Sequence, residues 1–212
     1  RGIDRQLIFE DSEDYLRFLN IVQECREICG FQLFAYCLMG NHVHLLLKVQ
    51  NDDLETVFKR IGGRYVYYYN VKYQRIGHLF QDRFRSEPVD DDAYFLSVLR
   101  YIHQNPVKAK LCSKVEDYPF SSFAEYLHES ACVDTEFALG MIDRNEFARS
   151  NNTPNSDTCM EYVTPARRAV TDTQAQVVIE QVSHCKTIIE FQELDEKKKE
   201  RFIKKIYGQG VS

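Results

Sequence analysis

The order of its predicted elements gives this 212-residue chain an α+β fold, with an antiparallel sheet and helices on one face. Three observations predict it. Apolar residues recur at helical spacing in three segments, each preceded by residues that cap helices. Two short apolar runs joined by a tight turn are typical of a β-hairpin. The order helix, strand, strand, helix, strand, helix fits a split β-α-β arrangement.

The first helix is predicted to begin at a cap formed by Asp11 or Ser12 and to run to about residue 28. Gly30 is expected to end it, because glycine readily adopts the left-handed backbone of a helix C-terminus. One apolar stripe marks the face that packs on the sheet. The stripe consists of Tyr15, Phe18, Leu19 and Val22.

The hairpin is predicted from strands at 31–38 and 42–49 with a turn at 39–41. Its second strand carries His42 and His44, which project from the same face because successive side chains alternate. Two imidazoles at this spacing can hold one divalent cation, whereas a histidine on an apolar strand can also be a hydrogen-bonded core residue. The opposite face is the predicted core face. It carries Val43, Leu45 and Leu47.

The second helix is predicted over residues 54–69 with a cap within 51–53, and Gly62-Gly63 indicates a bend or a close approach to a ligand. Between residues 56 and 86 there are seven basic residues, five interleaved tyrosines and a single acid, Asp82. Basic and aromatic side chains together suit single-stranded nucleic acid, whereas a solvated helix with a tyrosine-rich core face is the alternative. The predicted DNA-binding residues are Lys59, Arg60, Arg64, Lys72, Arg75, Arg83 and Arg85.

A loop and strand are predicted within 78–89, and a third helix over 93–104, which Pro106 is expected to end. Tyr101 and Asn105 share one face of this helix. A second face, formed by Phe95, Leu99 and Ile102, is expected to dock the helix on the sheet.

Tyr101 is a candidate nucleophile, although a packed aromatic is the alternative reading in a chain with 13 tyrosines. A phenol attacks poorly unless a cation polarises the group under attack, and a divalent metal can do so at a phosphoryl oxygen. Two histidines and one amide oxygen leave positions open for phosphate and water, which suits Mg²⁺ or Mn²⁺.

The composition and termini give further expectations. The net charge is −5, no apolar run approaches membrane-spanning length, and a signal-peptide pattern is absent, so a cytoplasmic protein is predicted. The seven cysteines lack metal-ligand spacing and are expected to be reduced thiols. The predicted division is a catalytic domain at 1–130, a helical linker region at 131–164 with short helices near 134–150, and a helical extension at 165–212. The first strand is expected to be truncated or supplied by residues 1–9, because the chain opens without Met.

Four stretches in this order resemble the single-tyrosine transposases of the HUH-endonuclease superfamily, closest to the REP-associated tyrosine transposases. They are residues 41–47, 77–84, 100–109 and 117–122. The resemblance covers roughly residues 1–130 and implies a ferredoxin-like fold. It also implies cleavage of single-stranded hairpin DNA by a bacterial cytosolic monomer or homodimer, giving a 5′-phosphotyrosine and a free 3′-OH.

The resemblance assigns roles to individual residues of this chain. It implies that His42, His44 and Asn105 bind the metal, with Gln104 as the alternative third ligand, and that Tyr101 is the nucleophile. The chain departs from the family pattern at both ends. Most of the first strand is missing, and the sequence stops where a helix-turn-helix would begin after the helical tail.

Three other functions are alternatives to a metal-dependent transposase. A catalytically inactive nucleic-acid-binding regulator derived from such an enzyme is the main alternative. A replication initiator or relaxase uses the same chemistry but fits the four stretches poorly, and a structural adaptor would not need a polar metal-binding set. The presence of His42, His44, Tyr101 and Asn105 together favours the enzyme.

Overall fold

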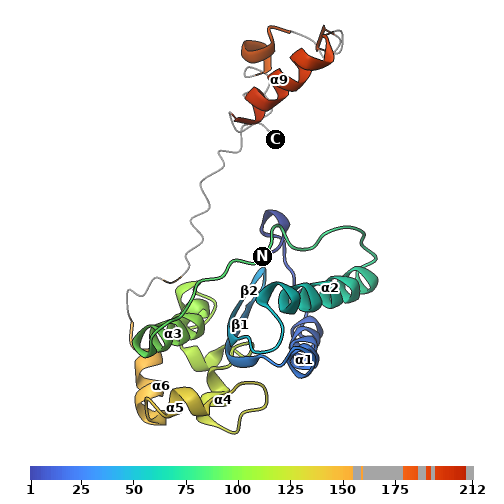
Figure 1. Cartoon of the computed structure of the whole chain (residues 1–212). Helices are drawn as coiled ribbons and strands as arrows, with labels where there is room; N and C mark the ends of the chain where they lie inside the picture. The colour runs from blue at the N-terminus through green and yellow to red at the C-terminus, as the bar shows by residue number, and fades with distance from the viewer. Residues whose placement is uncertain (155–158, 160–178, 186–189, 192–193, 209–212) are drawn as a thin grey trace. The chain divides into compact units, whose positions relative to one another are not determined.

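The computed structural model describes residues 1–154, 159, 179–185, 190–191 and 194–208, in two compact units, Arg1–Met160 and Glu161–Ser212. The first unit combines a β-hairpin with helices, which confirms the α+β class (Figure 1). The second contains α9 (Glu196–Gly208). The rest of the predicted helical extension lies largely outside the described residues. Within the described residues, no helix is long and apolar enough to span a membrane.

Each of the three long helices begins after an aspartate whose carboxylate accepts a backbone N–H of the first turn, as the sequence predicts. The helices are α1 (Ser12–Cys29), α2 (Leu54–Lys72) and α3 (Asp92–Lys108). The caps are Asp11, Asp53 and Asp91. Gly30 ends α1 in the left-handed conformation, with φ 68°.

The predicted hairpin forms from β1 (Gln32–Met39) and β2 (His42–Lys48), which pair antiparallel. Met39 lies opposite His42 and Cys37 opposite His44. The second edge of β1 pairs with the backbone of residues 120–122, since Leu38 N donates to Phe120 O at 2.9 Å. The candidate metal ligands therefore lie on β2, and its partner β1 is hydrogen-bonded on both of its edges.

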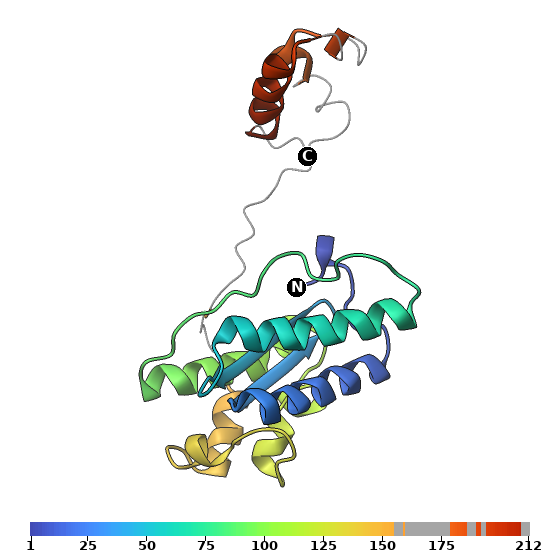
Figure 2. The ribbon, with the colours of Figure 1, turned by 45° about the vertical axis from the view of Figure 1, so that its right-hand side comes forward.

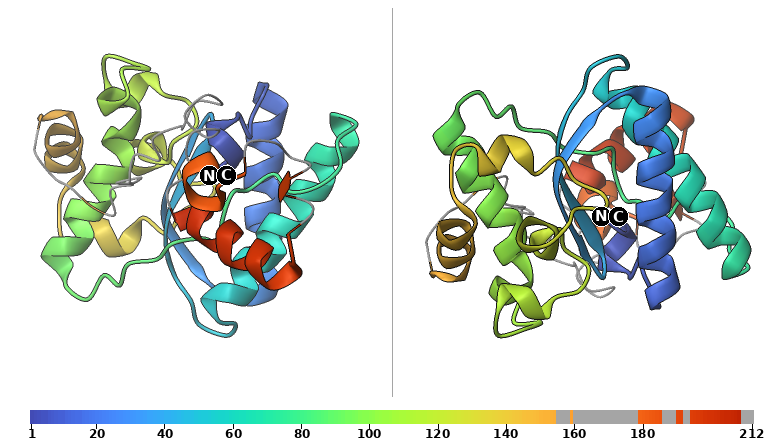
Figure 3. Two further views of the ribbon diagram at one scale, coloured as in Figure 1. Left: turned by 90° about the horizontal axis from the view of Figure 1, so that it is seen from above. Right: turned by 90° about the horizontal axis from the view of Figure 1, so that it is seen from below.

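Helices α1 and α2 lie on one side of the hairpin, whereas α3 lies on the other (Figures 1, 2 and 3). The core continues through the hairpin on both sides, because Phe34 of β1 contacts Phe95 of α3 and Phe18 of α1 contacts Tyr65 of α2. The docking face predicted for the third helix is confirmed, because Phe95, Leu99 and Ile102 are buried. This arrangement presents one face of β2 to α3.

Short helices complete the first unit. They are η1 (Ile3–Arg5), η2 (Val115–Asp117), α4 (Phe123–Leu127), α5 (Glu136–Leu139) and α6 (Arg144–Asn152). The last two confirm the short helices that the sequence predicts near residues 134–150. Helix α6 packs against α3 and η2 against its C-terminal part, so the tyrosine-bearing helix is supported from outside the hairpin.

The strand predicted within 78–89 was wrong, since the only pairing there is an isolated bridge between Gly2 and Phe80 within the described residues. Two features of the segment oppose a ladder. Phe84 stacks on Phe58 of α2, with ring centroids 4.4 Å apart, and Pro88 has no N–H to donate. Residues 1–9 likewise contribute η1 and this bridge rather than a strand.

Two predictions about helix breakers were also wrong. Pro106 lies inside α3, which continues to Lys108. Pro106 is buried together with Ile102 and His103, and this packing offsets the one backbone hydrogen bond that a proline near the end of a helix removes. Gly62 and Gly63 lie inside an unbroken α2, with open space where a Cβ would stand. They do not interrupt the helix, and a close approach to a ligand stays a prediction.

Candidate histidine–tyrosine site

Strand β2 and helix α3 bring three predicted site residues together. The rings of His42 and His44 lie 5.0 Å apart between centroids, at an interplanar angle of 84°. The ring of His44 lies 5.9 Å from that of Tyr101 in an edge-on contact. The side-chain alternation of β2 thus places both imidazoles on the face that α3 covers.

This face of β2 is at least as well covered as the predicted core face. Leu46, on the histidine face, is the buried residue of β2, whereas Val43, Leu45 and Leu47 are only partly buried. The prediction of a single core face was therefore incomplete, because α3 covers the histidine side. The imidazoles consequently lie in a partly water-excluded space.

Burial determines the protonation of the two imidazoles. It lowers the pKa of His42 to about 4 and the pKa of His44 to about 3, where the proximity of His42 adds to the effect. Both rings are therefore neutral at pH 7 and carry a lone pair. Neutral imidazole is the form that binds divalent metals.

One nitrogen in the site is buried without a partner. His44 Nε2 has no hydrogen bond within the part of the chain that the structure describes. An unsatisfied buried polar atom costs roughly 1–3 kcal/mol, so it is expected to serve a ligand or a water. Two neutral rings with an open nitrogen on one face fit a divalent cation.

The other ring, His42, is held by its neighbour. His42 Nδ1 lies 2.6 Å from Asn41 Oδ1, and Asn41 Nδ2 donates to Arg5 O at 3.2 Å. This contact occupies Nδ1 and leaves Nε2 to face a ligand. The sequence analysis placed Asn41 in the turn and in the stretch 41–47 that carries the resemblance, but gave its side chain no role, although its place directly before His42 was a usable signal.

Tyr101 has two polar neighbours on its own helix, the ammonium group of Lys108 and the side-chain amide of Asn105. Lys108 Nζ lies 5.0 Å from the centroid of the Tyr101 ring. Asn105 lies one turn after Tyr101 and its Nδ2 donates to Tyr101 O at 2.8 Å. The sequence did not single out Lys108, although it lies within a stretch that carries the family resemblance. A positive charge beside the phenol favours negative charge nearby.

Gln104, the alternative third ligand, is positioned elsewhere. Its Nε2 donates to Asn151 O at 2.8 Å and to Thr153 O at 2.9 Å, so the amide faces the end of α6. This corrects the suggestion that Gln104 could replace Asn105 as a ligand. Among the described residues, no group of three His, Cys, Asp or Glu side chains could hold a metal, so further ligands would be amide oxygens, water or substrate.

Several of the seven predicted DNA-binding cations contact protein groups instead of forming one open patch. Arg60 pairs with Asp52, Arg64 with Glu24, Lys72 with the acids at the start of α1, and Arg75 donates to Gln6. The acids come from elsewhere in the chain, which the local count of charges did not capture. The exposed members of this set are Lys59, Arg60, Arg64, Arg83 and Arg85.

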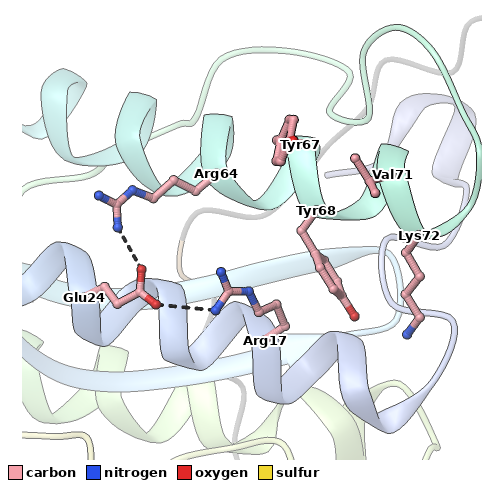
Figure 4. A pocket seen from close by; sticks show the side chains of 7 residues that line it. All are labelled: Arg17, Glu24, Arg64, Tyr67, Tyr68, Val71 and Lys72. Carbon is pink, nitrogen blue, oxygen red and sulfur yellow. Dashed lines mark hydrogen bonds and ion pairs between the residues drawn. The ribbon is translucent and has the colours of Figure 1, made fainter.

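A groove between α1 and α2 shows this pairing closely. Arg17 and Arg64 converge on Glu24, at 3.4 and 2.8 Å (Figure 4). Its further lining residues are Tyr67, Tyr68, Val71 and Lys72. Glu24 offsets the charge that would otherwise attract phosphate. The histidine–tyrosine site lies on the other side of the hairpin.

Comparison with known proteins agrees with this geometry. Residues 2–105, which include both histidines and Tyr101, match the family described as Transposase IS200 like. A REP-associated tyrosine transposase of Haemophilus influenzae is 32% identical over 123 residues, which cover 52% of this chain and 69% of the relative. The chain belongs to the IS200-like transposase family, among the REP-associated tyrosine transposases.

A solved structure supports the fold of this transposase. The structure of a REP-associated tyrosine transposase bound to a REP hairpin aligns with a TM-score of 0.53 at 17% identity. The alignment covers 71% of this chain and 79% of the solved one. At this identity the likeness concerns the fold alone.

Proposed function

We propose that this transposase cleaves and rejoins single-stranded DNA through a covalent bond to Tyr101, with a divalent metal, Mg²⁺ or Mn²⁺, held by His42 and His44. The observation that carries the proposal is the convergence of both imidazoles and the phenol of one chain, 5.0 and 5.9 Å apart by ring centroids. We place this catalytic part within residues 1–130, with Asn105 as the third metal ligand. Asn105 fits that role because it shares a helix face with Tyr101.

In the proposed reaction, the Tyr101 oxygen attacks the phosphorus of a phosphodiester. A bond from that oxygen to phosphorus forms as the bond from phosphorus to the 3′ oxygen breaks. The phenol loses its proton and the departing 3′ oxygen gains one, so the products are a 5′-phosphotyrosine and a free 3′-OH. Attack by a 3′-OH reverses these steps and rejoins strands without external energy.

The side chains contribute orientation and charge. The metal would polarise the phosphoryl oxygen under attack. His42 and His44 remain neutral at pH 7 and therefore keep lone pairs available to hold it. Lys108, beside the Tyr101 ring, would favour the approach of the anionic phosphodiester. The packing of α3 on the hairpin and on α6 fixes the phenol near the imidazoles.

The proposed substrate is single-stranded DNA that carries a hairpin. The support is the family membership and the solved relative, which is bound to a REP hairpin. The exposed cations Lys59, Arg83 and Arg85 are the proposed phosphate contacts. Phe84 lies between the two arginines and stacks on α2, which holds this segment in place.

The test is the formation of a covalent protein–DNA adduct. The protein is incubated with Mn²⁺ and a pool of single-stranded oligonucleotides in which a stem-loop is flanked by randomised bases. The wild type should form an adduct that survives denaturation, and Tyr101→Phe should form none because the attacking oxygen is gone.

Tyr94→Phe is the matched control. Tyr94 lies on the same helix, but its hydroxyl donates to Glu87 at 2.5 Å and is exposed, so this variant should react like the wild type. An adduct in Tyr101→Phe would refute the assigned nucleophile. A wild type that binds the pool without an adduct would instead identify the inactive regulator.

A further inference from the structure

We propose that Asn41 is a positioning residue that fixes the tautomer of His42, so that Nε2 of His42 presents its lone pair to the metal. The inference rests on the proposed metal-dependent function. Its evidence is a chain of hydrogen bonds from Arg5 O through the Asn41 side chain to the His42 ring.

The orientation of the Asn41 amide follows from its two partners. Its nitrogen, Nδ2, donates to Arg5 O at 3.2 Å, and a backbone carbonyl can only accept. The amide oxygen must therefore be the atom that lies 2.6 Å from His42 Nδ1. A flipped amide would place two oxygens against each other at Arg5.

The tautomer of His42 follows from the orientation of this amide. An amide oxygen has no hydrogen to donate, so Nδ1 must carry the ring hydrogen for the contact to be a hydrogen bond. A neutral imidazole has one such hydrogen, which leaves the lone pair on Nε2. Without Asn41, the ring hydrogen could move to Nε2 and block that atom as a ligand.

The N-terminal segment holds Arg5 O in place. Gly2 N donates to Asn41 O at 2.8 Å, and Ile3 N donates to Leu79 O at 3.2 Å. Asp4 and Arg5 have φ of 47° and 63°, a left-handed backbone that non-glycine residues adopt rarely and that turns the chain here. Residues 2–6 therefore join the turn before β2 to the segment around Leu79.

Such a contact has a measurable effect on metal binding. Metal-binding histidines usually donate their second ring N–H to a fixed acceptor, and loss of that acceptor costs about 10–100-fold in affinity. Asn41 supplies this acceptor for His42. Asn41 Oδ1 contacts the ring of His42, so the effect should be largest at that ring.

The experiment reads the tautomer without metal. Long-range ¹H–¹⁵N spectra of the metal-free protein distinguish the protonated from the bare nitrogen of each histidine ring. The variants are Asn41→Leu, which removes the acceptor, and Asn41→Asp, which keeps an oxygen beside Nδ1 but loses the donor to Arg5 O. Asn41 is not among the residues with positive φ, so neither change strains the backbone. Mn²⁺ affinity is then measured from the signal of free Mn²⁺ in electron paramagnetic resonance.

The wild type and Asn41→Asp should show His42 with its hydrogen on Nδ1. Asn41→Leu should show hydrogen on Nε2 or a mixture, and should bind Mn²⁺ roughly 10–100-fold more weakly. The ring of His103, bonded to Ser122 at 2.8 Å and Asn151 at 3.2 Å, is the internal control. Unchanged His103 signals in a variant show that its fold is intact. If the His103 signals change in Asn41→Leu, the variant Asn41→Ala is used in its place.

An unchanged His42 tautomer in Asn41→Leu would overturn the inference. A changed tautomer with unchanged Mn²⁺ affinity would equally overturn it, because Asn41 would then not serve the metal site. A wild type that binds no Mn²⁺ refutes the proposed metal dependence instead, since the tautomer spectra contain no metal.

Discussion

Two buried polar groups on opposite sides of the hairpin, Asp14 and His44, differ in how far the protein satisfies them. Between α1 and α2, Asp14 is fully buried and accepts hydrogen bonds from Glu10 N, Lys72, Tyr68 and Tyr73. On the α3 side, His44 Nε2 is buried with no partner in the described part of the chain. The protein itself supplies the hydrogen-bond donors for Asp14, whereas it leaves Nε2 of His44 open.

The difference separates a structural role from a binding role. Burial opposes the ionisation of Asp14, but the hydrogen bonds of its four donors outweigh it and lower its pKa. Such a network stabilises the fold once it is complete. The unbonded nitrogen of His44 lowers the stability of the fold. Such an atom is expected where a bound ligand or ion completes its coordination. Substitutions should therefore have opposite effects on the two sides.

The largest effect is expected on the α1–α2 side. Asp14→Ala should lower the free energy of unfolding by about 3 kcal/mol, because it removes the one fully buried acceptor that Glu10 N, Tyr68, Lys72 and Tyr73 share. Urea denaturation measures it. Glu13→Ala is the control, since Glu13 also pairs with Lys72 but its side chain is 71% exposed, and no measurable change is expected. Equal effects of the two variants would contradict the assigned role.

The opposite sign is expected at the histidine–tyrosine site. His44→Leu should raise the free energy of unfolding by about 1 kcal/mol, because it replaces an unsatisfied nitrogen by an apolar group of similar size. The same variant should lose Mn²⁺ binding. Denaturation and a Mn²⁺ titration on one preparation test both, and a loss of stability comparable to that of Asp14→Ala would make His44 structural.

A third buried group, His103, sharpens the comparison because both its ring nitrogens are bonded. Burial lowers its pKa to about 3, below the ordinary 6.5. Between these values the unfolded chain binds more protons, so stability falls as pH falls from about 6.5 towards 3. His103→Gln should make stability less dependent on pH in this window. The exposed His128→Gln is the control, and equal pH dependence in all three proteins would contradict the prediction.

The smallest effect concerns the exposed cations. Replacing Arg83 and Arg85 by Gln should reduce the slope of log affinity against log salt for single-stranded DNA by about 1.4, as expected for two phosphate contacts. Arg60 and Arg64, which pair with Asp52 and Glu24, are the matched control pair and should leave the slope unchanged. Binding at several salt concentrations measures this, and a larger change in the control pair would reverse the assignment.

Local signals in the sequence predicted much of this molecule. The capping aspartates located the starts of α1, α2 and α3, and the alternation of β2 correctly placed His42 and His44 on one face. These features depend on neighbours within a few residues. The edge-on contact of Tyr101 with His44 agrees with the predicted docking of the third helix.

The errors came from partners distant in sequence. Pro106 stays helical because of its burial, and residues 78–89 lack the neighbouring strand that their composition suggested. The basic stretch is largely offset by acids such as Glu24, 40 residues before Arg64. Asn41 gains its role from Arg5, which a contact 36 residues apart brings beside it. No local pattern contains such information.

Mapping the DNA-linked residue tests the central claim most directly. Trypsin cuts after Arg100 and Lys108, so Tyr101 is released as the only tyrosine of peptide 101–108, and Tyr94 in peptide 86–100. Mass spectrometry of the digested Mn²⁺-dependent adduct should find the nucleotide on peptide 101–108. A nucleotide on any other peptide, with 101–108 unmodified, would contradict the proposal that the phenol beside His42 and His44 is the nucleophile.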